Sequence, residues 1–117
     1  MNELARISLL KGLPGETLTR LARVMRREDV AAGARVVTEG EQGDRFYVIL
    51  QGMLAVSQSS LGPRRVLRPG DTFGEVALAM DVPRTATVHA LTPSVVASCD
   101  RAAFDEFLRP LYADDSL

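Results

Sequence analysis

The spacing of glycine is the feature that most narrows the folds open to this sequence. Seven of the nine glycines lie between residues 33 and 74, and short runs of β-branched and apolar residues separate them. Short strands punctuated by turn residues about every ten positions are typical of an all-β sandwich or barrel. The runs occupy residues 35–38, 46–51, 53–57, 65–67, 84–90 and 94–99. We therefore expect a mainly β domain.

The clearest strand pattern lies at residues 85–90. Ala86, Val88 and Ala90 alternate there with two threonines and His89. A period of two places the apolar side chains on one face and the polar ones on the other, which predicts a half-buried strand.

The two ends of the chain have helical patterns instead. Pro14 suits a first helical position, and Asp100 is a residue type that caps helix N-termini. The apolar residues that recur at helical spacing are Leu18, Leu21, Ala22 and Met25 in the first segment, and Ala103, Phe104, Phe107, Leu108 and Leu111 in the second. Pro110 is expected to end or kink the second helix. We therefore predict one domain, 1–117, with a helical segment at 1–27, a β-roll at 28–99 and a C-terminal helix at 100–111.

Composition excludes several classes of protein. The 117 residues suffice for one domain, and a net charge of −1 argues against a chain whose main task is to bind nucleic acid. Cys99 is the only cysteine, so no intramolecular disulfide can form. No apolar run approaches the ~20 residues that span a bilayer, and the first residues lack the apolar core of a signal peptide. We expect a cytoplasmic domain without membrane insertion.

The residues that indicate a binding site for an anion lie at 73–88. Gly74 permits a close backbone approach that a side chain would block, and the good helix formers after it predict about one helical turn. A short helix after a glycine presents unpaired backbone N–H groups, which form an anion site. Arg84 adds a fixed positive charge with a planar donor fork suited to phosphate oxygens.

Glu75 is unexpected beside an anion site, because its carboxylate would repel the anion. It needs a task of its own, such as accepting a hydrogen bond from a sugar hydroxyl. A ligand with one phosphate charge and an adjacent free hydroxyl satisfies both requirements, and a cyclic nucleotide is such a ligand.

The sequence also resembles a known family at these positions. Residues 73–78 read FGEVAL and residues 84–88 read RTATV, which is similar to the phosphate-binding cassette of the cyclic nucleotide-binding domain family. That family occurs in bacterial transcription activators, cyclic-nucleotide-dependent kinases and gated channels. Further similarity lies at Gly33, 39–44, 46–52 and 100–104. The resemblance implies a double-stranded β-helix, a jelly-roll-like β-roll.

The resemblance also implies roles for individual residues. Arg84 would pair with the cyclic phosphate, Glu75 would bind the ribose 2′-hydroxyl, and Gly52 would belong to the pocket wall. Thr85 could help to hold the ligand, and a hydroxyl at this position in the family is often associated with tolerance of cGMP. The predicted cyclic nucleotide-binding residues are Phe73, Gly74, Glu75, Val76, Ala77, Arg84, Thr85 and Ala86. The ligand is cAMP or cGMP, and no catalytic residue, metal or cofactor is expected.

The expected function is that of a regulatory sensor that is not an enzyme and belongs to a larger protein. Ligand phosphate would draw the cassette toward Arg84, and the helix with Phe104 and Phe107 would repack. The attached effector could be a transporter, a channel, a kinase or another regulator, or the chain could form a homodimer. Few residues follow Pro110, whereas many family members continue into a helix that closes over the base.

Other interpretations remain open at this point. Glu75 and Arg84 could form a simple surface ion pair, or the domain could be a degenerate, ligand-free module for protein interaction. A metal-dependent cupin enzyme would usually need two or more histidines, and this chain has only His89. Cys99 alternates with apolar residues, which indicates a buried, inert thiol. The basic residues Arg64, Arg65 and Arg68 are expected to form a solvated hairpin edge.

Overall fold

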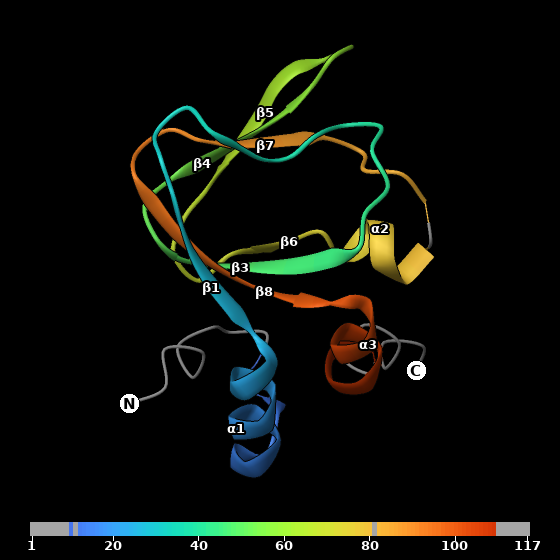
Figure 1. The fold of residues 1–117 in the computed structure, drawn as a ribbon. Helices are drawn as coiled ribbons and strands as arrows, with labels where there is room; N and C mark the ends of the chain where they lie inside the picture. The colour runs from blue at the N-terminus through green and yellow to red at the C-terminus, as the bar shows by residue number, and fades with distance from the viewer. Residues whose placement is uncertain (1–9, 11, 81, 110–117) are drawn as a thin grey trace.

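Two four-stranded antiparallel sheets face each other in the computed structural model, which describes residues 10, 12–80 and 82–109 (Figure 1). Sheet A has the strand order β1-β8-β3-β6, and sheet B has the order β2-β7-β4-β5. The strands are β1 (Arg26–Val30), β2 (Arg35–Val37), β3 (Arg45–Gln51), β4 (Leu54–Gln58), β5 (Gly62–Leu67), β6 (Thr72–Phe73), β7 (Thr87–Ala90) and β8 (Ser94–Asp100). The predicted mainly β roll with flanking helices is confirmed.

The helical elements lie outside the roll. They are α1 (Gly15–Val24), α2 (Glu75–Met80), α3 (Arg101–Ala103) and the π-helix η3 (Phe104–Leu108). The elements α1 and α3 lie below sheet A, whereas α2 lies at one end of the roll (Figure 1). No helix among the described residues is long and apolar enough to cross a membrane.

The two faces of β3 bury different parts of the core. Phe46 and Val48 belong to a cluster that includes Leu21 and Phe104 from the helices. The alternate residues, such as Ile49, belong to a second cluster with apolar residues of sheet B. Successive side chains of a strand point to opposite faces, so this one strand joins the helical layer to the interior of the roll.

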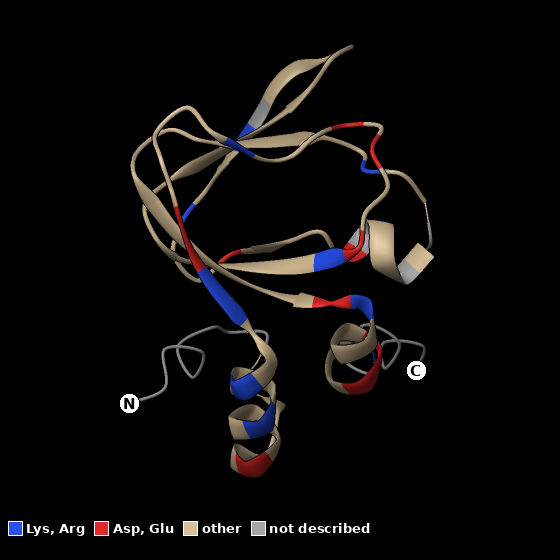
Figure 2. Cartoon of the chain, in the orientation of Figure 1, with Lys and Arg blue, Asp and Glu red and all other residues tan. Residues whose placement is uncertain are grey.

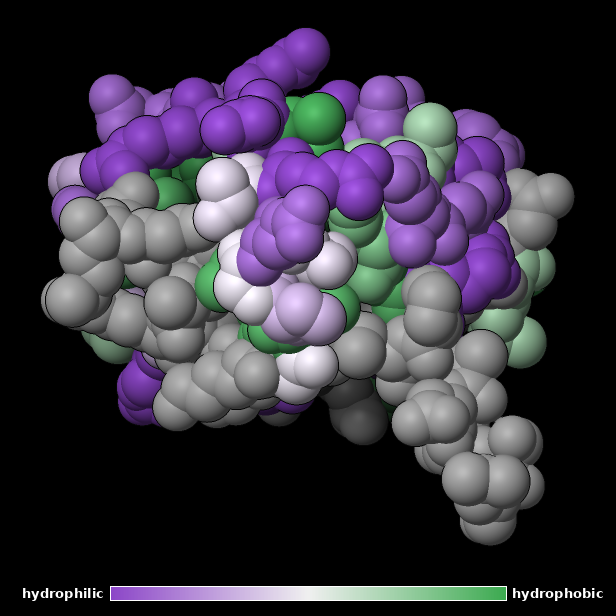
Figure 3. All heavy atoms as spheres, turned by 90° about the horizontal axis from the view of Figure 1, so that it is seen from below, coloured by the Kyte–Doolittle hydropathy of each residue, from purple (hydrophilic) through white to green (hydrophobic). Residues whose placement is uncertain are grey.

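The helical side of the molecule carries both positively and negatively charged side chains. Basic and acidic residues both occur along α1, β1 and the C-terminal helical segment (Figure 2). The described surface seen from this side is mostly hydrophilic, with smaller apolar patches between (Figure 3).

The β-roll begins two residues earlier than the predicted boundary between the helical segment and the roll. The helix ends at Val24, and Met25 is already extended. Arg26 and Arg27 pair with residues of β8, so they belong to the roll and not to the helical segment predicted at 1–27. The roll also continues to Asp100, one residue beyond the predicted end.

The strand predicted at residues 84–90 begins later, at Thr87. The backbone of Arg84 pairs with another segment: its N–H donates to the carbonyl of Glu41 at 2.8 Å, and its carbonyl accepts from the N–H of Gly40 at 2.9 Å. Thr85 therefore lies in a bend between this pairing and β7. Within β7 the predicted alternation is correct, because Val88 is buried and its neighbours are half-buried.

The C-terminal segment begins as predicted and then departs from a regular helix. The Asp100 carboxylate accepts a hydrogen bond from the N–H of Ala103 at 2.9 Å, which confirms the N-cap. The four described members of the predicted stripe are buried: Ala103, Phe104, Phe107 and Leu108. However, η3 has the i→i+5 hydrogen bonds of a π-helix. Pro110 and Leu111 lie outside the described residues.

Cys99 gives a prediction that depends on pH. Its side chain is fully buried, and burial raises the pKa of the thiol to about 11. The folded protein should therefore react slowly with a disulfide-exchange reagent at pH 8, and the urea-unfolded protein quickly, since an exposed thiol has a pKa of about 8.5. The unfolded state loses this proton first, so Cys99 should lower stability as pH rises from about 8.5 toward 11. Equal labelling rates for folded and unfolded protein would contradict the burial of the thiol.

Candidate functional site

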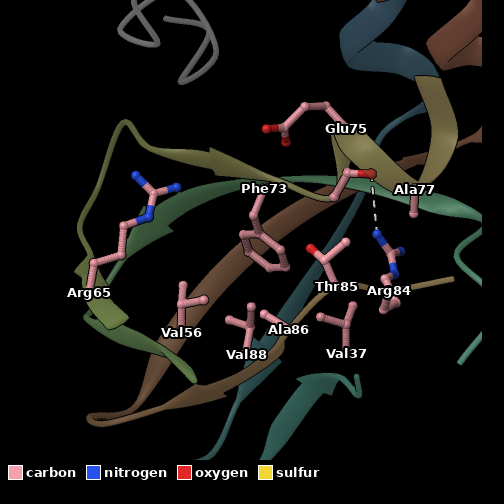
Figure 4. A pocket seen from close by; sticks show the side chains of 11 residues that line it. Val37, Val56, Arg65, Phe73, Glu75, Ala77, Arg84, Thr85, Ala86 and Val88 are labelled. Carbon is pink, nitrogen blue, oxygen red and sulfur yellow. Dashed lines mark hydrogen bonds between the residues drawn. The ribbon is translucent and has the colours of Figure 1, made fainter. Parts of the chain in front are cut away.

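A pocket opens between the inner face of sheet B and the start of α2 (Figure 4). Its empty volume is about 570 Å³, including the solvent at its mouth. The lining residues are Val37, Val56, Arg65, Phe73, Gly74, Glu75, Ala77, Arg84, Thr85, Ala86 and Val88.

Most of the predicted site residues meet in this pocket. The lining includes Phe73, Gly74, Glu75, Ala77, Arg84, Thr85 and Ala86. The side chain of Val76 lies outside the described residues. The geometry thus brings the two halves of the cassette together around one hollow, while the part that each residue takes in ligand binding stays a prediction.

Arg84 is the only charged side chain that is buried among the described residues, with 7% of its surface exposed. Its Nη1 donates to the carbonyl of Gly74 at 3.2 Å, and its Nη2 donates to the carbonyl of Arg45 at 2.8 Å. The guanidinium also lies over the ring of Tyr47, with Cζ 5.9 Å from the ring centroid. These contacts fix the direction of a buried positive charge.

The electrostatics of this region follow from burial. Burial lowers the pKa of Arg84 below its ordinary value, and Tyr47, Asp44 and Glu75 act in the opposite direction. Burial also raises the pKa of Tyr47, which the charge of Arg84 partly opposes. An arginine starts from so high a pKa that it stays protonated at neutral pH, so the pocket keeps a cation at this end.

Two glycines provide the space that the guanidinium occupies. A Cβ at residue 43 would lie 2.6 Å from the Cβ of Ala77 and 2.8 Å from Nε of Arg84. Gly74 has a φ of 98°, and a Cβ there would lie 2.8 Å from Nη1 of Arg84. The prediction that Gly74 permits close backbone approach is confirmed. Gly43 was part of the family pattern, but its contact with Arg84 was not foreseen.

Glu75 does not form the surface ion pair considered from the sequence. Arg84 is buried and directs its hydrogen bonds to backbone carbonyls, and no ion pair joins the two side chains in the described part of the chain. Oε2 of Glu75 is buried and accepts no hydrogen bond from the described residues. A buried acceptor without a partner is costly, so this oxygen is a candidate for contact with a ligand.

The floor of the pocket is a row of side chains across sheet B. Val37 pairs with Val88, Val88 with Val56, and Val56 with Arg65 at the edge of the sheet. Figure 4 shows Arg65 and Arg84 at opposite ends of this floor. The floor offers an apolar surface between two guanidinium groups.

Arg65 is the functional candidate that the sequence reasoning missed. It is exposed, as expected for a hairpin edge, yet it lines the pocket. The signal was present, because Leu67 is buried two positions later and residues i and i+2 of a strand share a face. Arg68 is exposed, and the side chain of Arg64 lies outside the described residues.

Gly52, expected in the pocket wall, lies elsewhere. It has a φ of 89° in the turn after β3, where an added Cβ would meet Pro93 and Ser94. Its role is to let this turn approach the start of β8, and the prediction that it lines the pocket was wrong.

Gly43→Ala tests the tight space around the guanidinium. We expect a loss of about 1–3 kcal/mol in the free energy of unfolding, because the new methyl group overpacks the contact with Ala77 and Arg84. Urea unfolding measures this loss. Gly15→Ala is the control, since nothing lies within 4 Å of a Cβ there. Equal stability of the two variants would show that the space is not tight.

Comparisons with known proteins show which family the chain resembles. The family model described as the cyclic nucleotide-binding domain matches residues 27–110. The chain is 41% identical to a cAMP-dependent protein kinase regulatory subunit of Candida albicans, over 90% of this chain and 23% of that protein. It is 37% identical to the cGMP-dependent protein kinase egl-4 of Caenorhabditis elegans, over 95% of this chain and 15% of that protein.

A solved structure is similar over nearly the whole chain. The regulatory domain of Toxoplasma gondii PKA, co-crystallised with cAMP, has a TM-score of 0.90 and 29% identity, and the match covers 97% of this chain and 46% of that one. The chain spans about a quarter or less of the length of the two curated relatives. On the match of the family model and the identity to these relatives, the chain belongs to the cyclic nucleotide-binding domain family.

Proposed function

We propose that this chain binds a cyclic nucleotide in the pocket beside α2 and serves as a non-catalytic, cytoplasmic regulatory module of a larger protein. One observation carries the proposal. A buried guanidinium lines the same pocket as a buried carboxylate oxygen that accepts no hydrogen bond from the described residues, beside an apolar floor. A cyclic nucleotide has an anion, a hydroxyl and a planar base to match these three features.

The phosphate would bind at Arg84. Among the described residues, its side chain makes two hydrogen bonds, which leaves three of the five guanidinium donors for an anion. The α2 helix begins directly after Gly74 and its first N–H groups have no partner within the helix. Charge-assisted hydrogen bonds from both sources would hold the single negative charge of the ligand.

The ribose would bind at Glu75. Its buried Oε2 needs a donor, and a free 2′-hydroxyl beside the cyclic phosphate supplies one. This contact would give the carboxylate a role next to an anion, since the hydroxyl separates the two negative charges.

The base would lie on the valine floor with its edge toward Arg65. Guanine presents two adjacent acceptors, O6 and N7, which match the two parallel donors of an arginine. Adenine presents a donor beside N7 and cannot accept both bonds. The hydroxyl of Thr85, also in the lining, adds a second polar group. These features favour cGMP over cAMP.

The effector belongs to the rest of the longer protein that we infer. Its relatives include a kinase regulatory subunit and a kinase, so a kinase is the effector that we favour. Ligand binding would shift α2, and buried contacts of Leu78 with the helical layer would pass the shift to the C-terminal segment. The rival interpretation, a ligand-free interaction module, predicts no change in melting temperature with millimolar cyclic nucleotide.

Arg84→Ala tests the phosphate contact. Calorimetric titration with cAMP and with cGMP should show binding to the unmodified chain and about 10- to 100-fold weaker binding to the variant, the loss expected when charge-assisted hydrogen bonds are removed. Arg35→Ala removes the same charge from an exposed position outside this pocket and should bind normally. Equal heats for the unmodified chain and Arg84→Ala would remove the phosphate role of Arg84.

Arg65→Met tests the contact with the base. The affinity for cGMP should fall about tenfold while that for cAMP changes little, because only guanine accepts both hydrogen bonds. Arg68→Met is the matched control, an exposed arginine just after the same strand. An equal fall for both nucleotides would show that Arg65 does not read the base.

A further inference from the structure

The carbonyl of Leu78 accepts hydrogen bonds from two arginines that lie far from it in the sequence. Nη1 of Arg101 donates to this oxygen at 3.1 Å, and Nη2 of Arg109 donates to it at 3.0 Å. Leu78 lies in the last turn of α2, and both arginines belong to the C-terminal helical segment. The carbonyl oxygen of Leu78 therefore joins α2 to the C-terminal helical segment.

The end of α2 needs such donors. The last four carbonyls of a helix have no partner within it, and cations stabilise this negative end. The six residues of α2 include no basic residue in the last turn. The two guanidinium groups supply from outside the charge that the helix itself lacks.

The π-helix explains how both arginines reach one atom. Residues eight positions apart in an α-helix differ by about 80° around the axis, at 3.6 residues per turn. The wider turns of η3 rotate the chain less per residue, and the N–H of Arg109 donates to the carbonyl of Phe104, five residues earlier. The reduced rotation turns Arg109 toward the face that carries Arg101.

Each arginine is also oriented by a second contact. Arg101 donates through Nη2 to the carbonyl of Gly43 at 3.4 Å, and Gly43 is the residue whose missing side chain leaves room for Arg84. Arg109 donates through Nε to Asp105 at 2.8 Å, and its Cζ lies 5.6 Å from the centroid of the Phe104 ring. A continuous chain of contacts thus runs from η3 through α2 and Gly43 to the guanidinium of Arg84.

We propose that Arg101 and Arg109 are positioning residues that hold α2 at the place where the pocket can bind phosphate, an inference that rests on the proposed function for its ligand. Neither residue is among those that line the pocket. By fixing α2 and the turn at Gly43 around Arg84, the two arginines set the affinity of the pocket for an anion. They also couple the two segments, so that the cassette is ordered when the C-terminal segment is ordered.

The first test needs no ligand. The amides of Val82 and Arg84 donate to the carbonyls of Ala77 and Glu41. Their hydrogen exchange should be about tenfold faster in Arg109→Gln than in the unmodified chain, because the end of α2 loses a charged donor. Arg20→Gln is the matched control, since Arg20 contacts Glu106 and the Phe107 ring on the same helical segment. Arg109→Lys, which keeps the charge, should restore part of the protection. Unchanged exchange in Arg109→Gln, or equal change in Arg20→Gln, overturns the proposal whether or not the chain binds a nucleotide.

The second test separates positioning from a general loss of structure. Arg109→Gln should weaken binding of cGMP about tenfold and change binding of guanosine, which lacks the phosphate, less than twofold. In an Arg84→Ala background the same change should have no further effect on cGMP, because the two act through one contact. Additive losses, or equal losses for cGMP and guanosine, contradict the proposal. A chain that binds neither ligand refutes the proposed function alone, and the exchange experiment then decides the role of the two arginines.

Discussion

The buried guanidinium of Arg84 is the interaction around which the pocket is organised. A charge removed from water is tolerated only when polar partners replace the lost hydration, and here the carbonyls of Gly74 and Arg45 do so. The space around the guanidinium is tight, so a side chain at residue 43 or 74 would fit only if neighbouring atoms shifted. The same requirement accounts for the bend before β7, since a continuous strand would not place Arg84 between these groups.

The two ends of the pocket have different chemistry. The end beside α2 has the Arg84 guanidinium, helix N–H groups and an oxygen of Glu75 that is unpaired among the described residues, whereas the opposite end has Arg65 above a valine floor. Phosphate and sugar are common to all cyclic nucleotides, and only the base differs. Affinity for the class and preference within it are therefore expected from different elements, α2 for the former and β5 for the latter.

Several parts of this arrangement could be predicted from the sequence because they depend on local patterns. The alternation within β7, the cap at Asp100 and the residue types at 73–78 each have a direct sequence signal. The partners of Arg84 have none, since a backbone carbonyl such as that of Arg45 is present whatever its side chain. Arg65 was misjudged because a charged residue on a hairpin is usually solvated, although Leu67 lies two positions later on the same face; its pairing with Val56 and its place in the lining show that it faces the pocket. The π-helix also lacks a sequence signal, because apolar residues at 104, 107 and 108 fit a regular helix equally well.

The most direct test of the central claim is a titration of the ¹⁵N-labelled chain with cGMP, followed by nuclear magnetic resonance. If Arg84 and the start of α2 hold the phosphate, the largest shifts will be those of the Arg84 Nε–H and of the backbone amides at residues 74–77. If those signals stay in place while amides on the outer face of sheet B or along α1 move, the nucleotide binds elsewhere and the account of the pocket is wrong.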